Sequence, residues 1–361
     1  MKKLSVLAAL AVLLLAGCSI PEVETVKFPG TDHYQVTFIG DIHYDGPQYH
    51  IKPMPERAKR LHFTQWQGAS QQVLAAAAEQ SKKDTAFVVQ LGDMIQGDCD
   101  NADLQGAAYQ DIFAMLKKYF AGKMLLAVRG NHGHRGLSDA KYAPERTLVP
   151  LIKKELGRDI KMVGTNYAVR YGKDLYIFYD YLPKNSGKLA IDALNSNADA
   201  RHVFFLTHLP MFPCSIGNPG WVVPQFKELI PLLARRKAIV INAHTHSMSD
   251  IVYKCDAGIL PQITVTSMGR EWLKKPKSEI RYKSFDEWKK NIRPAFYKNP
   301  KYKWSFENLQ YFKNEDFIRY RVGHLEPSGF VKIVINAEKV SAHIFTDNSG
   351  KPSKTIVLKD K

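Results

Sequence analysis

Five apolar, strand-like runs in this chain each end directly in a short cluster of aspartate, asparagine and histidine residues. The clusters are Gly40-Asp41-Ile42-His43, Gly92-Asp93, Gly130-Asn131-His132, Thr207-His208 and Asn242-Ala243-His244-Thr245-His246. Any one of them is ordinary, because glycine and aspartate are common in the turns that follow strands. Five in succession are too many to be separate accidents, so the pattern predicts one site built from five loops.

The runs that precede these clusters alternate with helical stretches, which is typical of an α/β fold. Strands are expected over Tyr34–Ile39, Ala86–Leu91, Lys123–Val128, His202–Leu206, Ala238–Ile241 and Ile263–Val265, and helices over Gln65–Gln80 and Tyr109–Phe120. A hairpin is expected from Asn166–Tyr171 and Leu175–Tyr179, and late strands over Phe330–Asn336 and Val340–Phe345. Ligands of open α/β sheets bind beyond the carboxyl ends of strands, so the five loops should converge there.

The order of the clusters resembles the calcineurin-like metallophosphoesterase superfamily, whose pattern runs Asp-x-His, Gly-Asp, Gly-Asn-His, His and Gly-His-x-His. The resemblance spans residues 40–246. It implies a four-layer α/β/β/α sandwich, here with a small C-terminal extension that contains β-strands. It also implies hydrolysis of a phosphate ester at two divalent metal ions. Two such ions about 3.5–4 Å apart polarise the phosphoryl group and activate water.

Carried over residue by residue, the resemblance also implies a division of roles. One ion would be held by Asp41, His43 and His246, the other by Asn131, His208 and His244, Asp93 would bridge both, and His132 would contact the transition state. These oxygen and nitrogen ligands suit manganese, iron, zinc or cobalt.

The sequence departs from the family pattern beside the expected catalytic histidine. Gly133 stands where an acidic residue commonly follows Gly-Asn-His, and His134 and Arg135 come next. The orientation and the charge state of His132 are therefore open at this point. Ala243, where glycine is usual, adds one methyl group, which should be tolerated.

The N-terminus has the pattern of an export signal. Lys2 and Lys3 precede an apolar run from Leu4 to Leu15 that is too short to span a membrane. The run 15–18, which ends in Cys18, resembles the bacterial lipobox and implies a lipidated cysteine and a lipid-anchored protein of the cell envelope. In a double-membraned bacterium this would be the outer membrane or the periplasmic face. A cleaved signal with a chance cysteine is the alternative.

The charge of the chain favours an anionic partner. The chain has 51 lysines and arginines against 35 acidic residues, for a formal charge of +16. A basic insert after the first cluster contains Arg57 and Arg60, which with His134 and Arg135 are the candidate substrate contacts; a solvated loop is the alternative. The remaining charge forms no stripe, so a small phosphate ester is favoured over nucleic acid. A phosphodiesterase or nuclease, and a metal-containing binding lipoprotein without turnover, are the alternative functions.

These features divide the chain into a signal (residues 1–18), a linker (19–30), a catalytic domain (31–269) and a C-terminal extension (270–361) that packs on it. The extension is rich in lysine and aromatic residues. Its aromatic side chains are expected to pack in the core rather than to stack on nucleic-acid bases. Besides Cys18, the chain has Cys99, Cys214 and Cys255, which allow at most one internal disulfide. The oligomeric state is open.

Overall fold

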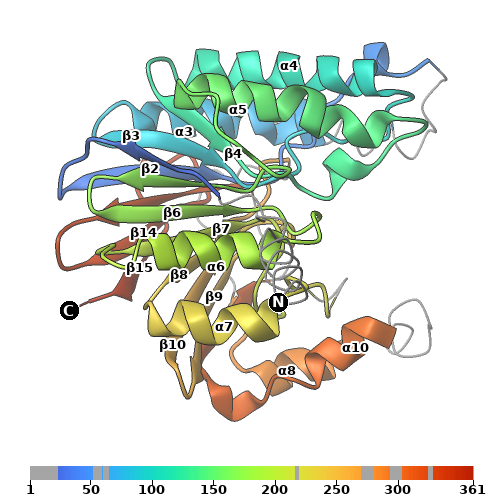
Figure 1. The fold of residues 1–361 in the computed structure, drawn as a ribbon. Helices are drawn as coiled ribbons and strands as arrows, with labels where there is room; N and C mark the ends of the chain where they lie inside the picture. The colour runs from blue at the N-terminus through green and yellow to red at the C-terminus, as the bar shows by residue number, and fades with distance from the viewer. Residues whose placement is uncertain are drawn as a thin grey trace, which may run out of the picture.

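The computed structural model describes residues 23–51, 59, 65–215, 219–269, 280–292, 303–323 and 328–360. Within them, two β-sheets pack face to face and helices cover the outer face of each (Figure 1). This arrangement confirms the expected α/β/β/α sandwich. Cys18, Arg57 and Arg60 lie outside the described residues.

One sheet has the strand order β15-β14-β13-β2-β3-β4. Its parallel half consists of β2 (Tyr34–Ile39), β3 (Thr85–Gln90) and β4 (Met124–Ala127), and its antiparallel half of β13 (Phe330–Ile335), β14 (Val340–Phe345) and β15 (Lys354–Lys359). β13 pairs directly with β2. The last three strands of the chain therefore complete the sheet whose parallel strands precede the first three polar clusters.

The second sheet has the strand order β1-β5-β6-β7-β8-β10-β9-β12-β11. The strands are β1 (Thr25–Phe28), β5 (Tyr167–Tyr171), β6 (Asp174–Tyr179), β7 (Val203–Thr207), β8 (Ile239–Asn242), β9 (Ser249–Cys255), β10 (Gly258–Thr264), β11 (Ile280–Tyr282) and β12 (Phe317–Gly323). β5 and β6 form the expected hairpin. Strands β6, β7, β8 and β10 are parallel, so their carboxyl ends lie at the same edge of this sheet.

Side chains alternate between the two faces of each strand, and those on the inner faces form the core between the sheets. On β2, the ring of Tyr34 faces the other sheet, where its hydroxyl donates to Asp174 Oδ2 at 2.8 Å. Phe87 of β3 meets Tyr176 of β6 edge to face, with ring centroids 5.0 Å apart. Thr37, on the opposite face of β2, bonds to Ser81 of a covering helix at 2.7 Å between hydroxyl oxygens. Each central strand is therefore buried on both faces.

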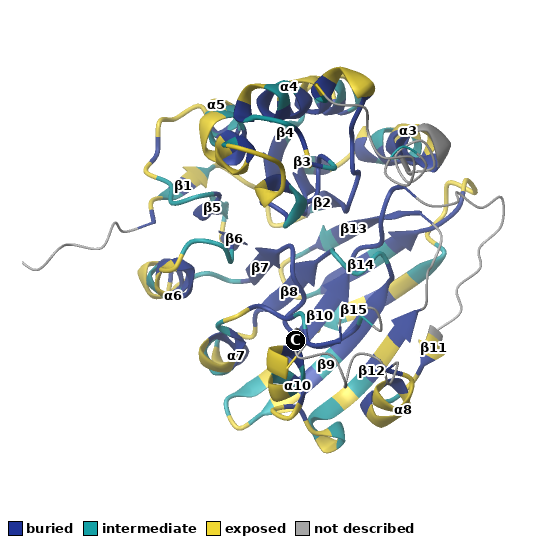
Figure 2. Ribbon diagram, turned by 90° about the vertical axis from the view of Figure 1, so that its right-hand side faces the viewer, coloured by how far each residue is buried: buried dark blue, intermediate teal, exposed yellow. Residues whose placement is uncertain are grey.

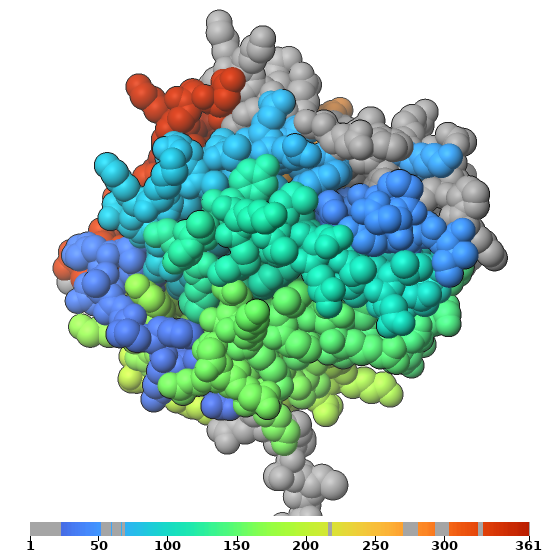
Figure 3. Space-filling model, turned by 90° about the horizontal axis from the view of Figure 1, so that it is seen from above, coloured from blue at the N-terminus to red at the C-terminus, as the bar shows by residue number. Residues whose placement is uncertain are grey.

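Helices cover the two outer faces. The six-stranded sheet is covered by α3 (Gln71–Ser81), which continues the π-helical turn η2 (Gln65–Ser70), by α4 (Ala102–Tyr119) and by α5 (Val149–Leu156). Figure 3 looks down on this face and shows the teal and green residues around α4 and α5 side by side. The other sheet is covered by α6 (Ser186–Ser196) and α7 (Phe226–Arg235), whose outer sides are exposed in Figure 2.

Shorter helices complete the described chain. They are η1 (Pro47–Tyr49), η3 (His132–His134), η4 (Ala140–Tyr142), η5 (Pro144–Leu148), α8 (Phe285–Lys290), α10 (Lys303–Leu309) and η7 (Asn314–Asp316). Trp288 and Phe312 are buried, in agreement with a core role for aromatic residues of this region. Cys99, Cys214 and Cys255 are free thiols. Among the described residues, no helix combines the length and the apolar character needed to cross a membrane.

Candidate metal centre

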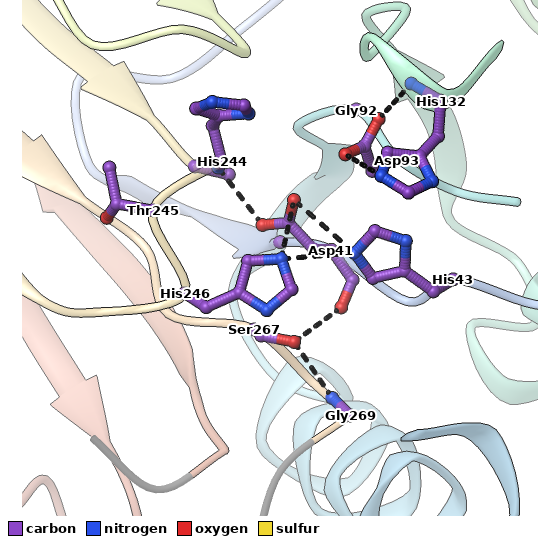
Figure 4. A network of polar contacts seen from close by, with 12 residues as sticks. Asp41, His43, Gly92, Asp93, His132, His244, Thr245, His246, Ser267 and Gly269 are labelled. Atoms are coloured by element: carbon purple, nitrogen blue, oxygen red, sulfur yellow. Dashed lines mark hydrogen bonds and ion pairs between the residues drawn. The ribbon is translucent and has the colours of Figure 1, made fainter. Parts of the chain in front are cut away.

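The five polar clusters meet at the carboxyl ends of five strands from both sheets. The predicted residues follow β2 (Asp41, His43), β3 (Asp93), β4 (Asn131, His132), β7 (His208) and β8 (His244, His246). Figure 4 shows the carboxylate of Asp41 among the rings of His43 and His246, and Asp93 facing His132. The structure thus brings together all eight residues to which the sequence assigned a metal or a catalytic role.

Asp41, His43 and His246 form the first group of possible metal ligands. The Nε2 atoms of His43 and His246 are 3.1 Å apart, and they lie 4.0 and 3.6 Å from Asp41 Oδ1. Asp41 Oδ1 is buried and accepts no hydrogen bond from the part of the chain that the structure describes. A buried carboxylate oxygen without a partner is costly, so a cation at this point would relieve it.

Asp93, His208 and His244 form the second group. His208 Nε2 lies 3.1 Å from each of Asp93 Oδ2, His244 Nδ1 and Asn131 Oδ1. Ligands about 2.1 Å from one ion at angles between 90° and 109° are roughly 3.0–3.4 Å apart. Both groups therefore fit a divalent cation, with some adjustment around Asp41. His208 Nε2 is 3.9 Å from Asp41 Oδ1, so the two groups are neighbours.

Four of these residues have left-handed backbone conformations. The φ angles are +52° at His43, +50° at Asp93, +70° at His244 and +54° at His246. Such a conformation is uncommon outside glycine and costs about 1–3 kcal/mol where it is strained. Because the loops bend sharply just after each strand, their side chains turn back toward a common point. Backbone strain concentrated in this way is typical of a functional site.

Neighbouring groups fix the orientation of the ligand side chains. His208 Nδ1 is 2.8 Å from the carbonyl oxygen of Leu91, which holds the proton on Nδ1 and leaves Nε2 as the ligand atom. The backbone N–H of His244 donates to Asp41 Oδ2 at 3.1 Å. The backbone N–H of His132 donates to Asp93 Oδ1 at 2.8 Å, so that Oδ2 faces His208.

Burial and nearby charges set the protonation states. Burial holds the pKa of His43 and of His244 well below the usual value for histidine. Burial acts to raise the pKa of Asp93, but the imidazoles of His208 and His132 outweigh it and keep that pKa well below the usual value. Burial raises the pKa of Asp41 to about 7. Burial acts to lower the pKa of His208, but the carboxylates of Asp93 and Asp41 outweigh it and raise that pKa to about 9. Neutral imidazoles at His43 and His244 and an ionised Asp93 are forms that bind cations, whereas a cation at His208 would displace a proton.

His132 lies beside this centre and is partly buried. Its Nε2 is 3.8 Å from Asp93 Oδ2, and its Nδ1 is 2.6 Å from the carbonyl oxygen of Gln96, which accepts the Nδ1 proton. His132 also forms a third group of possible ligands with His43 and Asp93. The geometry alone therefore places His132 within reach of a cation, and the family pattern is what gives it a separate role.

The match to known proteins agrees with the arrangement of these ligands. The family model of the calcineurin-like phosphoesterases matches residues 34–248, more than half of the chain. The chain belongs to the calcineurin-like phosphoesterase family. Its membership and its clusters of histidine and aspartate support divalent metal binding and phosphoester hydrolysis.

Two solved structures share the fold at low sequence identity. The structure of PhoD has a TM-score of 0.53 and 11% identity, covering 92% of this chain and 72% of that chain. A dimetal phosphatase from Danio rerio has a TM-score of 0.50 and 12% identity, covering 91% and 99% of the two chains. A search of curated protein sequences found no match.

The remaining predicted residues lie at the rim or outside the described chain. Arg135 lies beside His132, with Nη1 3.3 Å from its Nδ1, on the side of the ring away from Asp93. His134 is exposed. Within the insert, Tyr49 is buried and donates to Asp111 Oδ2 at 2.5 Å, so it supports the loop rather than offering a surface to substrate.

The sequence did not indicate two residues that flank the site. The ring of Trp221 stacks on the imidazole of His244, with centroids 5.1 Å apart and planes at 14°. Arg129, two residues after β4, is 3% exposed and pairs with Asp180 through Nη2 at 2.8 Å. Trp221 lies in no motif, and Arg129 directly precedes Gly130-Asn131-His132, which was its only distinguishing feature.

Proposed function

We propose that this family member hydrolyses phosphate esters at a dinuclear metal centre. The observation that carries the proposal is the pair of neighbouring ligand groups, one containing Asp41 and the other Asp93. Each group has a 3.1 Å contact between ligand atoms, and His208 Nε2 lies 3.9 Å from Asp41 Oδ1. The division of ligands is the one that the family pattern implies. Asp41, His43 and His246 would hold one ion, and Asn131, His208 and His244 the other, with Asp93 between them.

The chain's own residues then have distinct tasks. Divalent cations of manganese, iron, zinc or cobalt would supply charge to the phosphoryl oxygens and activate water. The backbone N–H of His132 donates to Oδ1 of Asp93, which leaves Oδ2 facing His208. The Nδ1–H of His132 donates to the backbone carbonyl oxygen of Gln96, which leaves Nε2 on the side of Asp93. Burial lowers the pKa of His132. The negative charge of a bound phosphoryl group would favour a second proton on Nε2, which would then be the donor to the leaving oxygen.

The proposed substrate is a small anionic phosphate ester. The excess of basic residues favours anions, and the candidate contacts Arg57 and Arg60 follow closely after Asp41 and His43 in the sequence. A nuclease or phosphodiesterase is the second reading. The formal charge of +16 supports nuclease activity. A lipid anchor outside the cytosol, which is proposed below, argues against nuclease activity.

The test is hydrolysis by the full chain in detergent, with manganese, of a phosphomonoester, a bis-phosphodiester and a panel of nucleotides. We expect turnover of at least one ester and its loss in Asp93→Asn. Asp199→Asn is the matched control, because that carboxylate is exposed, pairs with Arg170 and belongs to none of the ligand groups. Turnover that survives in Asp93→Asn would contradict the proposal.

We also propose export and a lipid anchor at Cys18, supported by the pattern of charge, apolar run and small residues before it. Mass spectrometry of the mature N-terminus should find acyl chains on Cys18, and Cys18→Ser should release the protein from membranes or block its processing. A mature chain that begins elsewhere and carries no lipid would refute the anchor.

A further inference from the structure

Two tryptophans form a small aromatic surface beside the proposed metal ligands. The ring of Trp221 stacks on His244, and His244 Nδ1 is 3.1 Å from His208 Nε2. The ring of Trp304 follows, with its centroid 6.4 Å from that of Trp221 and the planes at 30°. Trp221 therefore packs directly on a member of the second ligand group, and Trp304 extends the aromatic surface beyond Trp221.

Trp304 leaves much of its ring open to solvent. The residue is 44% exposed on α10, whereas Ser305 and Leu309 of the same helix are buried. Trp288 of α8 is buried as well. A tryptophan that stays exposed next to a binding site offers a large, rigid face to a ligand.

Backbone packing fixes the two rings relative to one another. A Cβ atom at Gly220 would lie 2.1 Å from the carbonyl oxygen of Ser305, so the loop before Trp221 can touch α10 only because residue 220 is glycine. Asn308 Nδ2 also donates to the carbonyl oxygen of Gly220 at 3.2 Å. The position of Trp304 is thus set by the contact between this loop and α10, which makes it a preorganised surface.

We propose that Trp304, supported by Trp221, binds a planar aromatic group in the alcohol portion of the phosphate ester. The substrate class is then an aryl or a nucleoside phosphate, since both present a ring that can stack. The inference rests on the proposed function, because the phosphoryl group must lie at the metal ligands for the ring to reach Trp304. Stacking accepts any planar ring, so this surface selects aromatic esters over alkyl esters.

The test compares three esters on the full chain in detergent with manganese: adenosine monophosphate, 4-nitrophenyl phosphate and glycerol phosphate. Trp304→Ala should raise KM for the two aromatic esters roughly tenfold and leave kcat nearly unchanged. KM for glycerol phosphate should change less than about twofold, and Trp304→Phe should restore most of the affinity. An effect on both aromatic esters identifies the ring itself, and an effect on the nucleotide alone identifies a nucleobase.

Tyr311→Ala is the matched control. Tyr311 is another partly exposed aromatic residue close to α10, and its ring packs on Phe226 and Phe312. Its loss should leave all three KM values unchanged. Equal changes of KM for glycerol phosphate and the aromatic esters in Trp304→Ala, or no change for any, would overturn the inference while the proposed function stands. If the wild-type protein hydrolysed none of the esters, the proposed function itself would fail.

Discussion

The hydroxyl group of Tyr109 fills the space that a side chain at position 133 would need. A Cβ atom built on Gly133 would lie 2.2 Å from Tyr109 Oη, and Tyr109 is buried in α4. Gln105, one turn earlier, donates from Nε2 to the carbonyl oxygen of Gly133 at 2.9 Å. The missing acidic residue after His132 is therefore tied to the close approach of α4 to this loop.

Gly133→Ala should consequently destabilise the protein by about 1–3 kcal/mol, because the added methyl group overpacks a buried contact. Tyr109→Phe removes the hydroxyl group and should restore much of the stability in the double variant. Urea unfolding of the wild-type protein, both single variants and the double variant measures the coupling. Strictly additive effects would show that the two residues do not compete for space.

His132→Ala should keep the bound metal but lower kcat by about 10²- to 10⁴-fold, because a proton donor to the leaving oxygen is removed. The loss should be largest for esters with poor leaving groups, which depend most on protonation. The checks are metal analysis and kcat across a series of leaving groups. Loss of metal from His132→Ala would instead place His132 among the ligands, as its contact with Asp93 and His43 allows.

Arg129→Met should lower the free energy of unfolding by about 3–5 kcal/mol, because it leaves the fully buried Asp180 without its counter-charge. Urea unfolding gives the value. Lys188→Ala, which removes an exposed partner of Asp192, is the control and should cost less than about 0.5 kcal/mol. Similar small losses for both variants would mean that the buried pair adds nothing to stability.

Arg57→Ala or Arg60→Ala should raise KM for the preferred ester with less effect on kcat, as expected for residues that bind the anionic substrate. The kcat/KM of the wild-type protein should change only modestly between 50 and 200 mM salt, since a small ester displaces few counterions. A protein that binds many nucleic-acid phosphates loses roughly 10³- to 10⁵-fold in affinity over this range. Cleavage of DNA or RNA with such a salt dependence would favour the nuclease reading.

The strands around the site were predictable because a buried strand is visible in the local sequence as a short apolar run. The strand expected over Tyr34–Ile39 has the observed bounds, since a short apolar run ends at a glycine. Helix α4 begins at Ala102, whereas the sequence predicted its start at Tyr109. The prediction did not use the N-cap residue Asn101, whose Oδ1 accepts a hydrogen bond from the N–H of Leu104. α7 was not predicted, and Pro231 lies inside it.

The surroundings of the site were less predictable because they depend on contacts between distant parts of the chain. The family pattern named the residues that converge, yet nothing in the local sequence indicates that Trp221 packs on His244 or that Tyr109 occupies the space beside Gly133. The pairing of β13 with β2 likewise joins segments that are far apart in sequence. The motifs identify the proposed metal ligands, whereas the residues that surround these ligands are set by tertiary packing.

Metal loading of the protein tests the central claim most directly. The full chain, stripped with a chelator and then titrated with manganese, should bind two ions and recover ester hydrolysis as they bind. Asp93→Asn should lose metal and activity together, because Asp93 belongs to the second ligand group and is proposed to bridge both ions. Full hydrolysis by the metal-free protein, or an Asp93→Asn variant that keeps both ions and the wild-type rate, would contradict the account.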